Sequence, residues 1–521
     1  MRKQEPELSL KTRKPYVLSL AVLALALFFY LPPALVNEAP FWDDKAYINN
    51  ALIASGRIEP SQAQGPYAEE RPPLFWWFLT LLYSAGLPVQ TARLMSPLTV
   101  AAGLVAVFLL TSKIFRSFMT GFLTALTLAV HDYFIQTTSY ILTDALGSIL
   151  AFLTLATFSL GLRYGPYMWA SGALLASAIL ARDQNLLLLP TIAVSMVWIA
   201  KASKTLKLLS TAALILLAFT ALYMTQEVFF QMISDAATVV LLDRAYLPFL
   251  ALLASFTSLV VYKVSEQKNL VSRRPSIEER FFDMLLAAVI CVAVLHPFFL
   301  DNVRLGEEYQ IEGRGVLSRP VAHSIMVRND IAKMGLNTYE RVSIWFSATL
   351  QLITIPILVL SVLGSILVLR DRVVQARPLI VWAAVSIPYV FFFTHIEYRF
   401  LAQAVPPLVS LAAYGITRIK NINKAVGLCL AAATVVVAAA PSFYMGLVPA
   451  PPEPAALNGW KILLGVSTAP ERWLSNYIEY LEGVMKQPQL EISPLNILSA
   501  CAMIPAISSA VYLGLRRGLE Y

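Results

Sequence analysis

Apolar residues along this chain gather in long, nearly continuous runs. Runs of roughly 17–25 residues, bounded by charged residues, Pro or Gly, recur along almost the whole sequence, as helices that cross about 30 Å of hydrocarbon require. The sequence lacks the period-two alternation of apolar and polar residues that a membrane β-barrel needs. The pattern therefore predicts an all-α polytopic membrane protein.

We expect about 13–14 transmembrane helices in one domain that covers residues 1–521, with further helices lying outside the membrane. The predicted spans are 16–36, 94–112, 118–136, 146–162, 167–182, 185–200, 208–226, 246–264, 284–300, 345–369, 379–394, 400–417, 425–445 and 494–514. The apolar segment 72–87 has only about 16 residues, fewer than a span needs. We expect it to lie against the outer face, with its Trp pair at the interface.

Charge predicts the orientation. Hydrophobic residues make up 58% of the chain and charged residues 14%, and the net charge is +8. In a soluble protein this excess would suggest nucleic acid, but here Lys and Arg cluster in short loops between the apolar runs, as the positive-inside rule predicts for cytoplasmic loops. We therefore expect membrane lipids and no nucleic acid as partners.

The basic N-terminus precedes an apolar run that is too long for a signal-peptide core, which indicates an uncleaved anchor with a cytoplasmic N-terminus. Both termini are then inside, and the large loops 37–93, 301–344 and 446–493 lie outside. The expected location is the plasma, or inner, membrane, with any active site on the outer face.

The first external loop begins with two adjacent carboxylates, Asp43 and Asp44, in the helix-like segment DDKAYINNALIASG, which ends in Gly56 as a plausible C-cap. One interpretation is structural: Asp43 caps the helix and Asp44 interacts with the helix dipole. The other is that one carboxylate is a general base that deprotonates an attacking hydroxyl or amine.

The same loop ends in Glu69-Glu70-Arg71-Pro72-Pro73. Because proline suits the first helical turn, this element predicts a helix start, either as an ordinary surface turn or as a phosphate site formed by Arg71 and the helix N-terminus. Glu70 is a candidate ligand of a divalent metal.

Asp144 lies where the fourth span enters from outside. It either caps that helix through Thr143-Asp144 hydrogen bonds or shapes an acceptor pocket together with Asp43. Arg182-Asp183 is most simply the turn between two spans, and these two side chains can also pair with each other.

The late segment His395 to Phe400 follows a very aromatic span and holds three ionisable side chains between apolar walls. We favour Arg399 as a bidentate phosphate ligand beside an apolar wall that holds a lipid tail. His323, in the external loop 301–344, is a further candidate metal ligand, and that loop is either a solvated face or an active-site lid.

Several familiar motifs are missing from the sequence, namely a Walker A loop, GxSxG, HExxH and GxGxxG. Nucleotide-driven transport and a soluble nucleotide-sugar fold therefore lose support, and no nucleotide is expected at the site. The three cysteines each lie in an apolar run, which suggests neither a disulfide framework nor a metal cluster.

The order of these elements resembles that of the GT-C superfamily of membrane glycosyltransferases, especially the branch of protein O-mannosyltransferases and aminoarabinose transferases of lipid A. The resemblance covers roughly the first 200 residues and a late element. The matching segments are Asp43-Asp44, Arg71-Pro72-Pro73-Leu74, Arg93-Leu94-Met95-Ser96, Leu142-Thr143-Asp144-Ala145 and His395 through Pro407.

The resemblance implies a donor sugar linked to polyprenyl or dolichyl phosphate and an inverting transfer to a lipid, glycan or protein acceptor. It implies that Asp43 is the base and that Asp44 and Asp144 organise the acceptor region. The residues it assigns to the donor phosphate are Arg71, Arg399, His395 and Tyr398. It assigns Glu70 to a divalent metal such as Mg, Mn or Zn.

The chain departs from the family pattern at three points. Arginine replaces lysine before Pro-Pro, Arg182-Asp183 replaces a T-K-G-like turn, and no sizeable soluble C-terminal domain is expected after the last predicted span. An oligosaccharyltransferase is disfavoured, because its W-W-D-Y-G motif and large external domain are absent. The competing class is a transporter or lipid flippase, which would need polar residues through the midplane and an internal repeat. A non-catalytic partner that keeps the fold is a third alternative.

Overall fold

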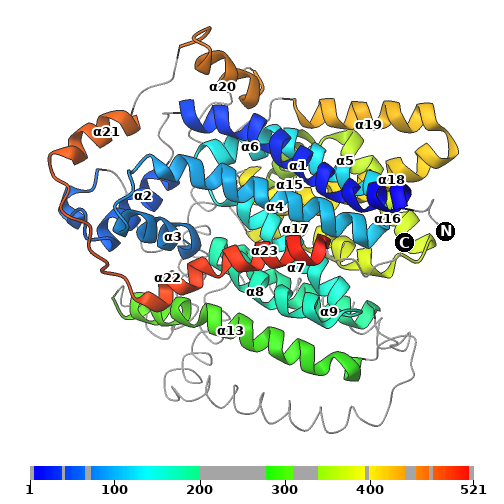
Figure 1. Ribbon diagram of the computed structural model, residues 1–521, viewed down its shortest axis with the longest axis horizontal. Helices are drawn as coiled ribbons and strands as arrows, with labels where there is room; N and C mark the ends of the chain where they lie inside the picture. Colours follow the sequence, from blue (N-terminus) through cyan, green and yellow to red (C-terminus); the bar gives the residue numbers. More distant parts are fainter. Residues whose placement is uncertain are drawn as a thin grey trace.

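In the part of the chain that it describes, the computed structural model consists of helices and the turns and loops that join them, and it contains no strand. The described residues are 5–37, 42–64, 72–199, 277–308, 338–393, 398–440, 453–468 and 473–515. The helices (Figure 1) are α1 (Glu5–Val36), α2 (Trp42–Ala54), α3 (Pro73–Ser84), α4 (Thr91–Phe115), α5 (Phe118–Val130), α6 (Asp132–Ser139), α7 (Asp144–Gly161), α8 (Gly165–Ala181), α9 (Leu188–Ile199), α13 (Ile277–Glu308), α15 (Thr338–Ile353), α16 (Ile355–Arg370), α17 (Arg377–Phe393), α18 (Val405–Ile422), α19 (Lys424–Ala438), α20 (Ala455–Leu463), α21 (Trp473–Glu482), α22 (Pro494–Cys501) and α23 (Met503–Leu515). Two short 3₁₀ helices, η2 (Asp183–Leu187) and η5 (Tyr398–Ala404), lie near the site described below. The predicted all-α class is confirmed.

The chain is a multi-pass membrane protein. Among the described residues, five segments are long and apolar enough to cross a membrane: Pro15–Val36, Thr91–Phe115, Asp144–Gly161, Arg399–Ile422 and Pro494–Leu515. Two helix pairs, α5 with α6 and α15 with α16, pass the same test together but bend by 54° and 87° at their breaks, so each is a broken span or a re-entrant segment. All of these coincide with predicted spans.

The other predicted spans within the described residues are occupied by shorter apolar helices, on α8, α9, α13, α17 and α19. Predicted spans 208–226 and 246–264 lie outside the described residues. Helix α3, with 12 residues, is too short to cross, as predicted. Its position against the outer face stays a prediction.

Helix α7 is the centre of the bundle, because every one of its residues is buried. It packs against α8, α4 and η5. Close helix crossings depend on small residues: a Cβ atom at Gly172 of α8 would collide with the backbone carbonyl of Ala287 in α13, and one at Gly364 of α16 with that of Leu411 in α18. Asp144 therefore begins a fully buried helix.

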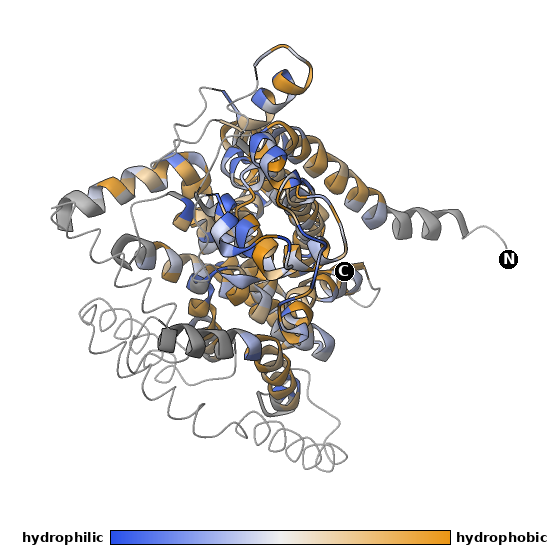
Figure 2. Cartoon of the chain, turned by 90° about the vertical axis from the view of Figure 1, so that its left-hand side faces the viewer, coloured by the Kyte–Doolittle hydropathy of each residue, from blue (hydrophilic) through white to orange (hydrophobic). Residues whose placement is uncertain are grey.

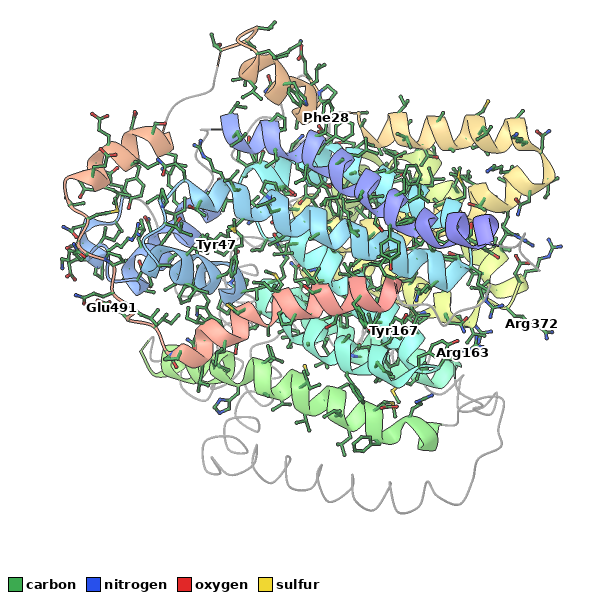
Figure 3. All side chains as sticks on the ribbon, in the orientation of Figure 1. Phe28, Tyr47, Arg163, Tyr167, Arg372 and Glu491 are labelled. Atoms are coloured by element: carbon green, nitrogen blue, oxygen red, sulfur yellow. The ribbon has the colours of Figure 1, made fainter. Side chains whose placement is uncertain are left out.

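The bundle has two chemically different ends. Arg163 and Arg372 lie at one of them, and Tyr47 and Glu491 lie at the other (Figure 3). At the first end the Arg280 guanidinium donates a hydrogen bond to the Arg163 carbonyl at 2.8 Å. We call it the basic end, because the predicted cytoplasmic loops of Arg163, Arg280 and Arg372 meet there.

The opposite end carries α2, α3, α20 and α21 (Figure 1). Figure 2 faces this end and shows hydrophilic segments among mostly hydrophobic helices. All four helices come from the predicted external loops or their borders, so the fold gathers these loops at one end.

Local sequence explains the ends of α2 and α3. Gly56, with φ of +68°, follows α2, and the Arg57 and Gly56 amides donate to the Leu52 and Ile53 carbonyls, each at 2.9 Å. This is the Schellman arrangement, which requires a residue in the left-handed region. Helix α3 begins at Pro73 directly after Pro72, as predicted.

Candidate functional site

A buried ion pair lies at the N-terminus of α7. The Arg182 guanidinium, which follows the end of α8, contacts the Asp144 carboxylate, and their side chains are 10% and 1% exposed. Thr143, the N-cap of α7, makes no side-chain capping bond. The Asp144 carboxylate therefore binds Arg182, and Asp183, the other predicted partner of Arg182, has its side chain outside the described residues.

The backbone around Asp144 is shaped to accept this arginine. A Cβ atom at Gly147 would lie 2.9 Å from Cγ of Arg182, so glycine leaves the room that the guanidinium arm occupies. Before the helix, buried Ile141 has φ of +57°, a conformation that costs a β-branched residue energy and that proteins keep mostly where function requires it.

Arg399 joins the same cluster through an aromatic ring. The Cζ atoms of Arg182 and Arg399 each lie 5.3 Å from the ring centroid of Phe400, which is buried. Both guanidinium groups thus contact one ring by cation–π interaction. Two predicted site residues that are far apart in sequence, Asp144 and Arg399, are brought together in this way.

A buried amide pair connects the turns that carry these arginines. Gln403 of η5 donates a hydrogen bond to Gln184 of η2 at 2.9 Å, and the Trp382 indole donates to the Gln403 carbonyl at 3.0 Å. Each glutamine lies within four residues of one of the arginines, Arg182 or Arg399. The pair therefore fixes the two turns relative to each other.

Helix α2 packs beside the N-terminus of α7, where this cluster lies. The Tyr47 hydroxyl is 3.1 Å from Oγ1 of Thr143, the residue before Asp144. Asp44 is buried, and burial together with the Asp44 carboxylate raises the pKa of Tyr140 to about 12, which puts Asp44 close to the turn between α6 and α7.

Helix α3 contributes Phe75, whose ring meets that of Tyr47 edge-on at 6.0 Å. The start of α7 and helices α2 and α3 therefore converge at the end of the bundle opposite the basic end.

Of the predicted site residues, Asp44, Asp144 and Arg399 have described side chains. Asp43 lies in the first turn of α2 and Tyr398 begins η5, but their side chains are outside the described residues. The remaining predicted residues outside the described part are Glu70, Arg71, His323 and His395. No group of three potential metal ligands occurs among the residues that the structure describes.

Sequence reasoning missed Phe400, Tyr47 and the two glutamines, and it assigned Arg182 to a turn. A signal for Arg182 was present. Asp144 and Arg182 carry opposite charges at the outer ends of neighbouring predicted spans, so they lie at the same depth, where burial favours pairing. Phe400 and the glutamines carry no comparable signal.

Comparisons with known proteins find no matching family model and no match among curated proteins. Among solved structures, the chain is similar to the archaeal oligosaccharyltransferase AglB from Archaeoglobus fulgidus, in complex with an inhibitory peptide and a dolichol-phosphate, with a TM-score of 0.43 and 14% identity. This match covers 98% of this chain and 57% of that chain.

A second similar structure is the Archaeoglobus fulgidus oligosaccharyltransferase tethered with an acceptor peptide containing the NVT sequon via a disulfide bond, with a TM-score of 0.45 and 12% identity. This match covers 93% of this chain and 60% of that chain. The chain thus spans less than two thirds of the length of either structure, and similarity at this level does not assign it to a family.

Proposed function

We propose that this chain is a membrane glycosyltransferase of the GT-C type, which transfers a sugar from a polyprenyl- or dolichyl-phosphate donor to a lipid, glycan or protein acceptor. The observation that carries the proposal is the cluster of Asp144, Arg182, Phe400 and Arg399 beside helix α2. It combines buried carboxylates with two guanidinium groups at a single end of a membrane bundle. The motif order described above supports the same class.

The charges of the cluster suit a phosphate leaving group. Arg182 binds Asp144, and Arg399 lies over the face of Phe400, so two guanidinium groups bring positive charge to one place, where a phosphate is favoured. Positive charge placed where negative charge develops is a strong form of transition-state stabilisation. In the proposal, Arg399 and, from the sequence, Arg71, His395 and Tyr398 bind the donor phosphate.

The reaction is a single displacement with inversion. Asp43 removes a proton from the acceptor hydroxyl or amine, and that atom forms a bond to the anomeric carbon. The bond between this carbon and the phosphate oxygen breaks, and the phosphate leaves with the electron pair. Asp44, in the same turn of α2, and Asp144 orient the acceptor.

The described residues do not bring three metal-ligating side chains together, so we derive no step through a metal. A divalent ion such as Mg, Mn or Zn, with Glu70 or His323 as a ligand, is a proposal from the sequence alone. We also propose, from the sequence alone, that transfer takes place at the outer face of the plasma membrane.

The test is transfer by purified protein from radiolabelled polyprenyl-phosphate sugars to candidate acceptors. We expect Asp43→Asn to abolish transfer while insertion and donor binding are retained. The matched control is Asp371→Asn at the basic end, which should transfer at the wild-type rate. Wild-type turnover by Asp43→Asn would exclude the proposed base.

The same preparation tests the transporter class. In proteoliposomes, a flippase would move the lipid-linked sugar across the bilayer without changing it chemically. If the donor crosses the bilayer and none of the acceptors receives its sugar, the proposed glycosyltransferase activity is wrong.

A further inference from the structure

A segment that is distant in sequence from helix α2, namely α21 and the chain between α21 and α22, packs against α2. We call residues 473–493, which comprise α21 and the extended chain after it, the C-terminal strap. In Figure 1 the strap runs from α21 past the outer side of α2 and α3 to α22. Leu474, Tyr477 and Leu481 lie on one face of α21 and are buried. The strap is therefore packed onto the molecule along this face.

The first connection is a buried hydrogen-bond relay. The Tyr477 hydroxyl donates to Oδ1 of Asn49 in α2 at 2.8 Å, across 428 residues of sequence. Nδ2 of Asn49 donates to the Gln64 carbonyl at 3.3 Å. Asn49 is completely buried, and burial raises the pKa of Tyr477 to about 12, so its hydroxyl keeps its proton at physiological pH.

The second connection joins backbone to backbone at the end of α2. The amides of Lys486, Gln489 and Glu491 donate to the carbonyls of Arg57, Ser55 and Ala54 at 2.9, 2.7 and 3.1 Å. The final carbonyls of a helix have no partner within it, and the strap supplies partners here. A Cβ atom at Gly56 would lie 3.0 Å from Cβ of Gln489, so glycine permits this close approach.

These contacts hold α2 from two sides. Tyr47, which binds Thr143 beside Asp144, and Asn49, which binds the strap, are two residues apart and therefore about 200° apart around the helix. The bundle thus fixes one face of α2, and the strap fixes the other.

We propose that the C-terminal strap positions α2 for catalysis and that Tyr477 and Asn49 are positioning residues, which hold the carboxylates of the first turn of α2 at the start of α7. This inference rests on the proposed function. Groups that take part in catalysis must be held within about 0.5 Å of their working geometry, and a 13-residue helix outside the membrane needs supporting contacts for this.

The test removes one oxygen atom. Tyr477→Phe should lower kcat about five- to tenfold, the effect of losing one hydrogen bond, and leave the KM of the donor unchanged, because the arginine cluster is untouched. Amide hydrogen exchange over residues 44–57 should become faster. Tyr480→Phe is the matched control: its ring stacks on that of Tyr477 and is partly exposed, and it should behave as wild type.

A double-mutant cycle separates a shared hydrogen bond from two independent effects. Asn49→Leu should lower kcat to a similar extent, and Tyr477→Phe combined with Asn49→Leu should be no slower than the slower single variant. Additive losses would overturn the relay between these two residues.

If the wild type is active, either of two results would overturn the positioning role. In the first, amide hydrogen exchange over residues 44–57 is the same in Tyr477→Phe as in the wild type. In the second, this exchange is faster in Tyr477→Phe but kcat does not change. A wild-type protein that transfers no sugar from any donor would instead refute the proposed function. The two failures are distinguishable, because one appears only in the variants and the other already in the wild type.

Discussion

At the scale of single residues, the Asp144–Arg182 pair is the feature that most needs a reason. Desolvating two charges costs several kcal/mol, which their attraction only partly offsets, so apolar residues of similar volume are often as stable or more so. A buried pair at the start of the fully buried helix α7 is therefore better explained by the chemistry that we propose than by stability.

This argument predicts how the pair responds to mutation. Asp144→Asn or Arg182→Met alone should lower the free energy of unfolding by about 3–5 kcal/mol, because the remaining charge stays buried without its partner. The double variant should recover most of the stability but no transfer activity. Thermal unfolding of the detergent-solubilised protein measures the first effect and the transfer assay the second.

A control for this experiment is the pair of Asp371 with the half-exposed Arg418 at the basic end. Breaking it with Asp371→Asn should cost less than about 1 kcal/mol, because solvent screens exposed charges. If the double variant Asp144→Asn with Arg182→Met is as unstable as the worse single variant, the ion pair is not the source of the loss.

At the scale of elements, the break between α15 and α16 concentrates backbone strain. Thr354 has φ of +66° and ψ of 145°, a region that β-branched residues rarely adopt, and the two helices meet there at 87°. Its buried hydroxyl has no hydrogen-bond partner among the residues that the structure describes. Pro356, in the first turn of α16, favours the start of a new helix here, and Thr354 carries the unfavourable backbone angles at the break.

Replacing this residue should therefore stabilise the protein. Thr354→Gly should raise the free energy of unfolding by about 1 kcal/mol, since relief of roughly 1–3 kcal/mol of strain exceeds the greater entropy of glycine in the unfolded chain. Thr354→Ala removes the hydroxyl but keeps the strain, so it is the comparison. A Thr354→Gly protein that melts below Thr354→Ala would show that the backbone there is not strained.

At the scale of the whole molecule, the basic loops and the candidate site lie at opposite ends of the bundle (Figure 3). The positive-inside rule then predicts that Arg372 faces the cytoplasm and Glu491 the outside. This orientation would give the site access to lipid-linked donors on the outer face.

Single cysteines test the orientation. In a background with Cys291, Cys429 and Cys501 replaced, we expect Glu491→Cys to react with a membrane-impermeant maleimide in intact cells. Arg372→Cys should react only after permeabilisation. The reverse pattern would place the site in the cytoplasm, and labelling of both positions from one side would contradict the two-ended bundle.

The sequence by itself determined what short stretches of chain can decide. The length of the apolar runs determined the spans, because the thickness of the hydrocarbon layer fixes the length of a helix that crosses it. Pro72-Pro73 determined the start of α3. Gly56 determined the end of α2, because glycine enters the left-handed region without a steric cost. Asp144 and Arg399 were also found from sequence, because charges between apolar runs are conspicuous.

Only the tertiary structure decided which side chains meet. Arg182 and Asp144 are 38 residues apart, and Tyr477 and Asn49 are 428 apart, on helices whose relative position no local pattern encodes. At the bend of α15 and α16, Pro356 in the first turn of α16 indicates a helix start, but the sequence gives neither the 87° angle nor the left-handed backbone of Thr354. Such features follow from how the helices pack, since burial pairs charges and imposes backbone angles that a residue would not adopt alone.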